Sequence, residues 1–524
     1  MISPTTPLSS PPYPAVAPAV PPPAGERLRI VYDNDAHEHW EGMARSVTAF
    51  DVFTRQAQAN GEDVLRLTAG DDNTGPEPQE FAVGVMLNNL KGVQATTPGN
   101  HEYDMNPAYY AQTLSQLANY PTLSANQVLP PTSALLPLQA SGKFSVNGRI
   151  VPTASGQPVG VIGVTLPEVS HIINKNVPRD GTDSLDLDGS IQAVQAQADA
   201  LRQQGVTRAV VVSHLGYEKD QQLAQRLRGV DVIVGGHTHT KVNGIYPQRN
   251  LLRGADGQPV LLLQAGSFGR QVGVADLAFT PAGVLNPEQS QNQLYSTAQF
   301  APSPAAVQVM NQYLPPARPV ANLAAGYSAD NMHTGPNPVA QFAADSLRDA
   351  CQADIGLVRA AEIRGDMPAG LFTSRDLAQA MPFADQVVRL RLTGEQLLGA
   401  LRRAAQGLTT SDDHHNQLLH PSGLAYTADK TTGALVNAQV FNQQTGRWAP
   451  IDPQQTYTVA LCEYAVQNPE ENPELAHPDQ VEGATGKTLA EVFHWGLQQA
   501  ALRQTGSLQG AIQLLAVDGR LTVV

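Results

Sequence analysis

Apolar runs that end in short polar stretches constrain the fold of this chain more than any other feature. The runs are rich in β-branched residues, as buried strands are, and cover residues 28–32, 64–68, 159–164, 209–212 and 230–234. Amphipathic helical spacing lies between several of them. Strands that alternate with helices predict a layered α/β fold, whose functional sites assemble in the loops that follow the strands.

Length and local composition divide the chain into parts. With 524 residues, it is too long for a single hydrophobic core. We predict a disordered Pro-rich tail over residues 1–26, a first α/β domain over 27–297, a linker with a short helical stretch over 298–325, and a second α/β domain over 326–524. In the second domain, Thr393 and Gln396 predict a capping box at the start of a helix.

The overall composition limits the classes of partner. A net charge of -14 argues against a nucleic-acid polymer, which calls for basic patches. No apolar run is long enough to span a membrane. The first 26 residues lack the basic and compact apolar parts of a signal peptide. Cys351 and Cys462 are free to pair or to stay reduced.

Several polar stretches after the apolar runs hold the residue types of a metal centre. They are Asp35-Ala36-His37, Gly70-Asp71, Gly99-Asn100-His101-Glu102, His214 and Gly235-Gly236-His237-Thr238-His239. Asp35 and His37 are two residues apart, so both can reach one ion from the same loop. Asp71 is the natural carboxylate to bridge two divalent ions roughly 3.5–4 Å apart, an arrangement that activates water and neutralises phosphoryl charge. Imidazole with oxygen ligands favours Zn, Mn, Fe or Co over Ca.

A second role is predicted for His101, because its neighbour Asn100 supplies the neutral oxygen ligand. We expect His101 to face the substrate and to give a proton to the departing oxygen. Asp104, three residues on, is placed to hold the other ring nitrogen and keep the ring protonated. Taken singly, each histidine is more often a surface or core residue, and Asp71 alone fits a turn or a helix cap. The combination after strand ends favours the metal centre.

These motifs resemble those of the 5'-nucleotidase family, including its 2',3'-cyclic-nucleotide 2'-phosphodiesterase/3'-nucleotidase relatives. The resemblance implies a four-layer α/β/β/α calcineurin-like metallophosphoesterase domain, followed by a second α/β domain that binds substrate. It also implies that His101 and Asp104 form a catalytic dyad. One ion is then held by Asp35, His37, Asp71 and His239, and the other by Asp71, Asn100, His214 and His237.

The resemblance extends to the second domain, where Arg364 matches an arginine that grips the substrate phosphate. Arg359 stands nearby, where the family has Asn. Leu418 replaces one of two aromatic rings that stack on the base, and Tyr464 stands as the second ring. We therefore expect an altered base pocket. Rotation of the domains about the linker is expected to carry Arg364 to the ions.

The residues and the resemblance together predict a dimetal-dependent phosphohydrolase that removes phosphate from nucleotides by in-line attack of metal-bound hydroxide. The alternatives are a 2',3'-cyclic-nucleotide 2'-phosphodiesterase/3'-nucleotidase or a UDP-sugar hydrolase and, more distantly, a non-catalytic binding protein on the same fold. The resemblance implies a periplasmic or secreted protein, although no signal peptide is visible, and a cytoplasmic location is the alternative. The sequence leaves the oligomeric state open.

Overall fold

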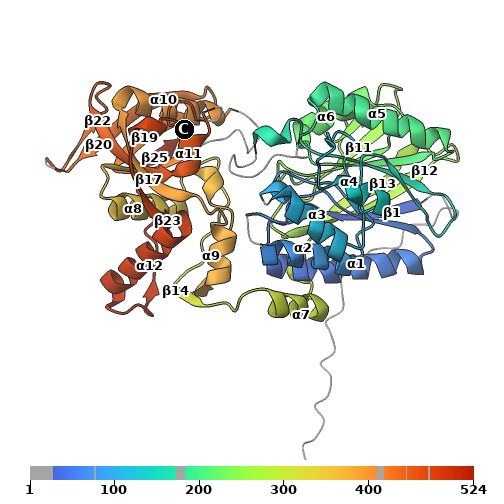
Figure 1. Cartoon of the computed structure of the whole chain (residues 1–524), viewed down its shortest axis with the longest axis horizontal. Coiled ribbons are helices and arrows are strands. Elements are labelled where there is room, and N and C mark those ends of the chain that lie inside the picture. The colour runs from blue at the N-terminus through green and yellow to red at the C-terminus, as the bar shows by residue number, and fades with distance from the viewer. Residues whose placement is uncertain are drawn as a thin grey trace, which may run out of the picture.

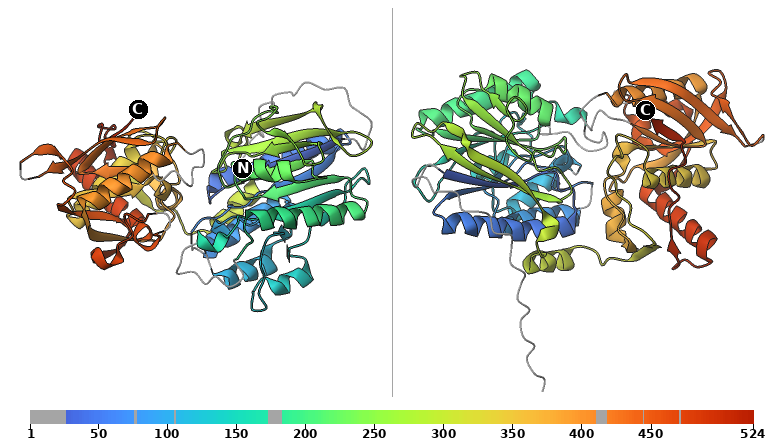
Figure 2. Two further views of the ribbon diagram at one scale, coloured as in Figure 1. Left: turned by 90° about the horizontal axis from the view of Figure 1, so that it is seen from above. Right: turned by 180° about the vertical axis from the view of Figure 1, so that it is seen from behind.

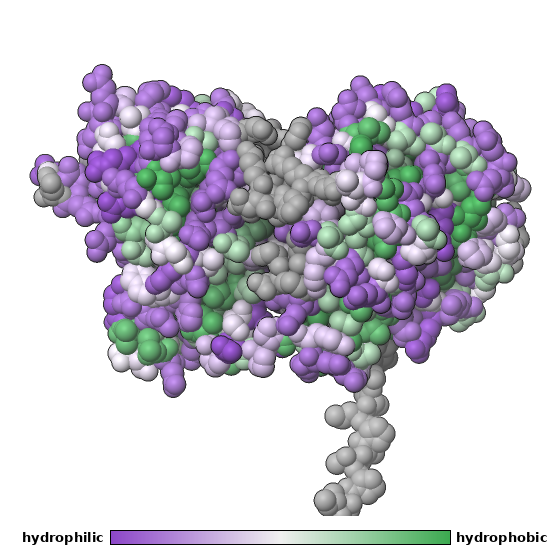
Figure 3. All heavy atoms as spheres, viewed as in Figure 1, coloured by the Kyte–Doolittle hydropathy of each residue, from purple (hydrophilic) through white to green (hydrophobic). Residues whose placement is uncertain are grey.

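The computed structural model describes residues 27–75, 78–104, 106–172, 183–409, 418–443, 445–469 and 472–524. These residues form two lobes that lie side by side and are joined through α7 (Pro304–Tyr313) and β14 (Pro319–Leu323) (Figures 1 and 2). The predicted tail over residues 1–26 lies outside the described residues. Polar residues cover most of the visible surface of both lobes, with smaller apolar patches between them (Figure 3).

Two sheets form the centre of the first lobe, in the strand orders β13-β12-β1-β2-β3-β4-β5 and β10-β11-β9-β8-β7-β6. The first sheet consists of β1 (Arg27–Asp33), β2 (Asp63–Thr68), β3 (Ala95–Thr96), β4 (Thr122–Leu123), β5 (Phe144–Ser145), β12 (Gln271–Phe279) and β13 (Leu285–Ser296). The second consists of β6 (Arg149–Val151), β7 (Val159–Val164), β8 (Arg208–Ser213), β9 (Val232–Gly235), β10 (Leu251–Arg253) and β11 (Pro259–Leu263). Neighbours β1, β2 and β3 run parallel, as do β7, β8 and β9.

Helices cover the outer faces of both sheets. Those of the first lobe are α1 (Trp40–Ala59), α2 (Pro78–Lys91), α3 (Pro107–Leu117), α4 (Leu136–Ser141), α5 (Leu187–Gln203) and α6 (Tyr217–Arg226). In Figure 1, α5 and α6 lie on one side of the sheets and α1 and α2 on the other. The predicted four-layer α/β/β/α arrangement is therefore confirmed.

The order of side chains along the strands explains the layers. Leu28 and Ile30 of β1 lie in the core between the two sheets, with Val210 of β8. Val31, the residue after Ile30, points to the other face of the sheet and packs with Phe50 of α1 in a separate core. A strand covered on both faces buries every side chain, so it reads as a continuous apolar run rather than an alternating one.

The second lobe is built around the sheet β18-β15-β22-β17-β23, with two smaller sheets, β21-β20-β19-β25 and β16-β14-β24. Its other strands are β15 (Ile355–Arg359), β16 (Gly370–Thr373), β17 (Gln386–Thr393), β18 (Leu419–Ser422), β19 (Leu424–Asp429), β20 (Ala434–Asn442), β21 (Arg447–Pro450), β22 (Thr456–Cys462), β23 (Val481–Thr488), β24 (Ala511–Ile512) and β25 (Leu521–Val523). Its helices are α8 (Pro338–Cys351), α9 (Ser374–Ala380), α10 (Gly394–Gly407), α11 (Glu463–Gln467) and α12 (Leu489–Thr505). The capping box of Thr393 and Gln396 is present at the start of α10.

The segment between the lobes, predicted as a linker over residues 298–325, contributes to both. Ala306 and Leu314, within and just after α7, pack in a core with Val83 and Leu87 of α2. Strand β14 pairs with β16 and β24 of the second lobe. The domain bounds themselves stay a prediction.

The structure also bears on the two cysteines and on the expected lack of a membrane-spanning segment. Cys351 and Cys462 are both buried and free. Among the described residues, no helix combines the length and apolar character needed to cross a membrane.

Candidate metal centre

The predicted ligands meet at one edge of the two sheets, where parallel strands end. Asp35 follows β1, Asp71 follows β2, His214 comes directly after β8, and His237 follows β9. Asn100 lies beyond β3, immediately before a single 3-10 turn, His101–Tyr103. The carboxyl ends of parallel strands share an edge, so residues far apart in sequence converge there.

The side chains form two adjoining groups. Ligand atoms of Asp35, His37 and His239 lie within 4.8 Å of one another, and so do those of Asp71, His214 and His237. In the first group, His37 Nε2 is 3.0 Å from His239 Nε2. In the second, His214 Nε2 is 3.0 Å from Asp71 Oδ2. His214 Nε2 is also 3.9 Å from Asp35 Oδ1, so the two groups share one space.

Five of these residues have a left-handed backbone. Their φ angles are 50° for Asp35, 48° for His37, 52° for Asp71, 75° for His237 and 54° for His239. Such a backbone costs on the order of 1–3 kcal/mol for a residue with a side chain, and it persists only where neighbouring structure imposes it.

Here the loops that follow β1 and β2 hold each other in place. The Asp35 amide donates to Gly70 O at 2.9 Å, and the His37 amide donates to Asp71 O at 3.0 Å. The left-handed turns direct side chains from both loops to one point.

Hydrogen bonds on the far side of the rings fix which nitrogen faces the centre. His214 donates from Nδ1 to Ala69 O at 2.6 Å. His37 Nδ1 is 2.6 Å from the Thr74 hydroxyl, which itself donates to Asn73 O at 2.8 Å. The hydroxyl therefore accepts from His37, and Nε2 of both histidines is left as the atom that faces the centre, as in metal-bound imidazoles generally.

Glu102 is a supporting residue whose role the sequence analysis did not predict. Its buried carboxylate accepts from the amides of Asp71 at 3.0 Å, Asp72 at 3.2 Å and Gly99 at 2.6 Å, so it ties together the loops after β2 and β3. Burial, and then the charges of Asp71 and Asp72, raise its pKa to about 8. Asn34 supports the loop after β1 by donating to Asp35 Oδ2 at 2.6 Å. In the sequence, the supporting roles of Glu102 and Asn34 were indicated only by the positions of these residues beside predicted ligands.

The electrostatics of the centre suit divalent cations. Asp35 and Asp71 are fully buried carboxylates. The amide oxygen of Asn100 is buried and has no hydrogen-bond partner among the described residues, which is costly unless a cation accepts its lone pair. Burial and the charge of Arg364 hold the pKa of His37 well below its usual range, so its ring is neutral, as a ligand must be. The residues present at this site therefore suit divalent cations as their ligands.

His101 lies beside this centre with the predicted partner. Its Nδ1 is 2.7 Å from Asp104 Oδ2, and that carboxylate also accepts from the Gly75 amide at 2.8 Å. Burial lowers the pKa of His101, but the charges of Asp104 and Asp71 outweigh burial and raise it. Because Nδ1 is engaged, Nε2 is the nitrogen left for a substrate. The ring centroid lies 5.2 Å from that of His37.

The second lobe brings one predicted residue into the centre. Arg364, which is buried, places Nη2 3.2 Å from His37 Nε2. Its carbonyl accepts from His39 Nε2 at 3.3 Å, so main chain and side chain of Arg364 both contact the first lobe. Phe383 also reaches across, with its ring 6.0 Å from that of His101.

The predicted base pocket is only partly assembled. The Arg359 guanidinium lies 4.7 Å from the centroid of the Tyr464 ring, a cation–π contact that occupies part of the ring surface. Leu418 is fully buried in the core of the second lobe. Its side chain has no exposed surface in this structure, and its part in the base pocket stays a prediction.

Comparison with known families finds two matches. The calcineurin-like phosphoesterase family matches residues 28–241, and the 5'-nucleotidase C-terminal domain matches residues 319–476. The 5'-nucleotidase of Rattus norvegicus is 30% identical over 287 residues, which cover 49% of this chain and 47% of that protein. The NAD 5'-nucleotidase of Haemophilus influenzae is 24% identical, with 83% of this chain and 84% of that protein covered.

Another relative is much longer than this chain. The trifunctional nucleotide phosphoesterase protein YfkN of Bacillus subtilis is 23% identical, and the match covers 83% of this chain but 31% of that protein. The chain thus spans about a third to a half of the length of the first curated relatives that it matches. A crystal structure of a 5'-nucleotidase precursor from Thermus thermophilus has the same fold, with a TM-score of 0.79, 24% identity, and 95% of this chain and 99% of that chain covered.

Stacked sheets with ligand-bearing loops at one edge, followed by a domain that presents an arginine to them, define a two-domain calcineurin-like phosphoesterase. The chain therefore carries a calcineurin-like phosphoesterase domain, followed by a 5'-nucleotidase C-terminal domain. Membership in this class implies divalent metal ions.

Proposed function

We propose that this protein is a phosphohydrolase that removes the phosphate group from nucleotides with the help of two divalent ions. The observation that carries the proposal is the meeting of two ligand groups with an arginine from the second lobe, 3.2 Å from His37. A cluster rich in carboxylates and imidazoles holds cations, and a guanidinium beside it holds the anion that those cations attract.

The ions would be held by Asp35, His37, Asp71 and His239 on one side, and by Asp71, Asn100, His214 and His237 on the other. When bound, they supply activation of water and neutralisation of charge on the phosphoryl oxygens. Mn, Zn, Fe and Co all suit this set of ligands.

The remaining steps fall to three side chains. Arg364 holds the phosphate through its planar fork of donors. His101 gives a proton from Nε2 to the departing ester oxygen, and Asp104 keeps the ring oriented and charged. Arg359 and Tyr464 form the side of the site that contacts the rest of the nucleotide.

The experiment is a substrate panel on protein stripped of metal and then reloaded separately with Mn, Zn, Fe or Co. We expect metal-dependent release of phosphate, fastest from 5'-nucleotides. Absence of metal-dependent hydrolysis of both p-nitrophenyl phosphate and bis-p-nitrophenyl phosphate would favour a binding protein instead.

A second candidate function is a 2',3'-cyclic-nucleotide 2'-phosphodiesterase/3'-nucleotidase or a UDP-sugar hydrolase. The names of two relatives that match 83% of this chain, a trifunctional nucleotide phosphoesterase and an NAD 5'-nucleotidase, support a range of esters beyond simple monophosphates. Faster turnover of 3'-, 2',3'-cyclic or UDP-sugar substrates in the same panel would select it.

We propose a periplasmic or secreted location. The names of relatives from snake venom and of a precursor protein support export. Fractionation of source cells with antibody detection tests this proposal, and recovery only in the cytoplasm would contradict it.

A further inference from the structure

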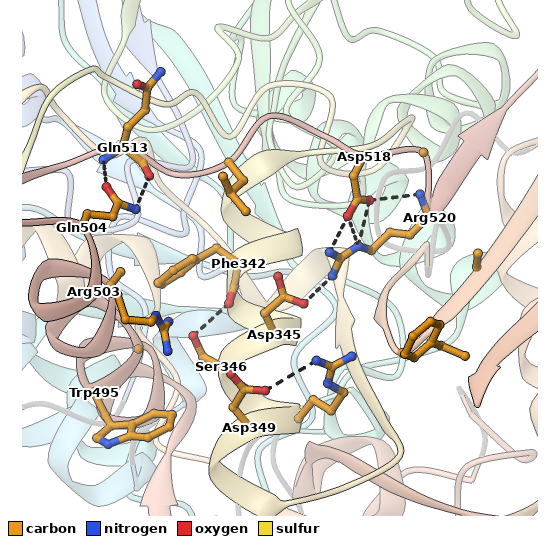
Figure 4. A pocket seen from close by; sticks show the side chains of 18 of the residues that line it. Phe342, Asp345, Ser346, Asp349, Trp495, Arg503, Gln504, Gln513, Asp518 and Arg520 are labelled. Atoms are coloured by element: carbon orange, nitrogen blue, oxygen red, sulfur yellow. Dashed lines mark hydrogen bonds and ion pairs between the residues drawn. The ribbon is translucent and has the colours of Figure 1, made fainter. Parts of the chain in front are cut away.

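The second lobe contains a cavity that is separate from the metal centre. It has a volume of about 670 Å³, within the range of small-molecule sites. Its walls come from α8, α12, the strands β19 to β21, and the chain that leads into β25 (Figure 4). None of its lining residues is among the predicted ligands or substrate-binding residues.

Aromatic side chains from separate elements line this cavity. Phe441 of β20 and Trp448 of β21 pack edge to face, with centroids 5.3 Å apart, and Trp448 is 46% exposed. Trp495 of α12 also lines the cavity, beside Gly496. A side chain at Gly496 would collide with the Ser346 hydroxyl, so this glycine lets α12 approach α8 next to the tryptophan. Flat apolar faces of this kind suit a ring-shaped ligand.

Much of the charge that lines the cavity is internally paired. Arg520 Nε donates to Asp518 Oδ1 at 2.9 Å, and Arg520 Nη1 donates to Asp345 Oδ1. Ser422 donates to the same Asp345 oxygen at 2.6 Å. The lining holds three arginines and three aspartates, so formal charges balance. Fixed donors and acceptors without net charge favour hydroxyl groups, which both donate and accept, over a phosphate or an ammonium group.

We propose that this cavity binds an uncharged, polyhydroxylated ring, of the chemical class of a saccharide. The apolar faces of the sugar rings would stack on Trp448 and Trp495, and the hydroxyl edges would meet the network of Arg520 with its two carboxylates. This site is independent of the proposed phosphate hydrolysis.

The small number of tryptophans in the chain makes tryptophan fluorescence a direct measure of ligand binding in the cavity. Of its three tryptophans, Trp448 and Trp495 line the cavity, and Trp40 is buried in α1 of the first lobe. We therefore suggest titrating the full-length protein with maltose and cellobiose while following tryptophan emission. A final concentration of about 10 mM is high enough to detect binding with a dissociation constant in the millimolar range. Adenosine and inorganic phosphate serve as probes of the competing classes.

We expect saturable emission changes with at least one saccharide, and about tenfold weaker binding by the W448A variant, measured calorimetrically. The W448A variant should fold because Trp448 is half exposed. L371A, which removes an exposed apolar side chain outside the cavity, should bind as the wild type does. No response to either saccharide, unchanged affinity in W448A, or saturation only by adenosine or phosphate would overturn the proposal.

Discussion

Under the proposed function, the side chains around the centre divide between those that hold cations and those that contact the substrate. His101 and Asn100 are neighbours in sequence, yet the side-chain oxygen of Asn100 has no partner in the part of the chain that the structure describes, while His101 is paired with Asp104. The first residue is therefore suited to a cation and the second to a proton transfer.

Replacing His101 with Asn should lower kcat by roughly 10²–10⁴ because the general acid is lost, while the bound metal stays unchanged. Phosphate-release kinetics and metal content by mass spectrometry measure both quantities. The matched change His494→Gln, in α12, controls for loss of an imidazole elsewhere. A His101→Asn protein that loses its metal would instead assign His101 to the ligand set.

Replacing Arg364 with Lys should weaken kcat/KM by about tenfold to a hundredfold, since a point charge does not reproduce the two-pronged contact with phosphate. Metal content should not change. Arg402→Lys, at a half-exposed position on α10, is the matched control. Unaltered kinetics in Arg364→Lys would show that this arginine does not hold the substrate.

At the scale of elements, close approach between loops is what makes the centre compact. A side chain at Gly99, in the loop after β3, would lie 2.1 Å from Asp71 Oδ1 and 2.6 Å from His214 Cε1. The loops after β2, β3 and β8 meet at this point, and only a residue without a Cβ fits.

Gly99→Ala should therefore weaken metal binding at least about tenfold, since it displaces Asp71 and His214, two residues of the same ligand group. Competition with a chelator, followed by metal analysis, measures the change. Gly483→Ala, with open space around it in β23, should behave as the wild type does. Equal metal retention in the two variants would contradict the packing argument.

A buried histidine in strand β18 should make the free energy of unfolding depend on pH. His420 is buried and donates from Nε2 to Met332 O at 2.9 Å, and burial lowers its pKa to about 4. Its pKa in the unfolded chain is about 6.5, so between those values the unfolded state binds more protons. This contribution to stability is complete above about pH 6.5 and falls by about 3 kcal/mol as the pH drops to about 4.

Unfolding of His420→Gln in urea across that pH window should be less dependent on pH than unfolding of the wild type. The amide of Gln keeps a donor for Met332 O. His494→Gln controls for removal of an imidazole. An identical pH dependence in wild type and His420→Gln would contradict this assignment.

For the whole molecule, contacts between the lobes set the position of Arg364. Arg270 of the first lobe forms ion pairs with Asp330 at 2.9 Å and Asp366 at 2.7 Å in the second. Both pairs are partly exposed, so each contributes about 0–1 kcal/mol and weakens with salt.

Arg270→Gln should shift the balance between closed and open lobes by up to about tenfold toward open. Fluorescence energy transfer between labels on the two lobes measures the shift, and KM should rise with it. High salt should make the wild type resemble the variant. Arg253→Gln, whose hydrogen bond to Gly257 O stays within the first lobe, should have no effect. A closed population unchanged in Arg270→Gln would rule out this role.

Features that depend on residues close together in sequence could be predicted, whereas contacts between residues far apart in sequence could not. The convergence of the candidate ligands could be predicted because each one lies within a few residues of a strand end, and the ends of parallel strands meet. Glu102 could not be assigned, because its role depends on three amides that only the folded loops bring together. The pairing of Arg270 with Asp366 joins residues 96 positions apart, and the second-lobe cavity draws on several elements, so neither leaves a local pattern.

The central claim is that a pair of divalent ions shares the Asp71 carboxylate. Anomalous diffraction from crystals soaked in manganese tests it most directly. The account predicts two peaks roughly 3.5–4 Å apart, with an Asp71 oxygen in contact with both. A single peak, no peak, or two peaks that Asp71 does not touch would contradict it.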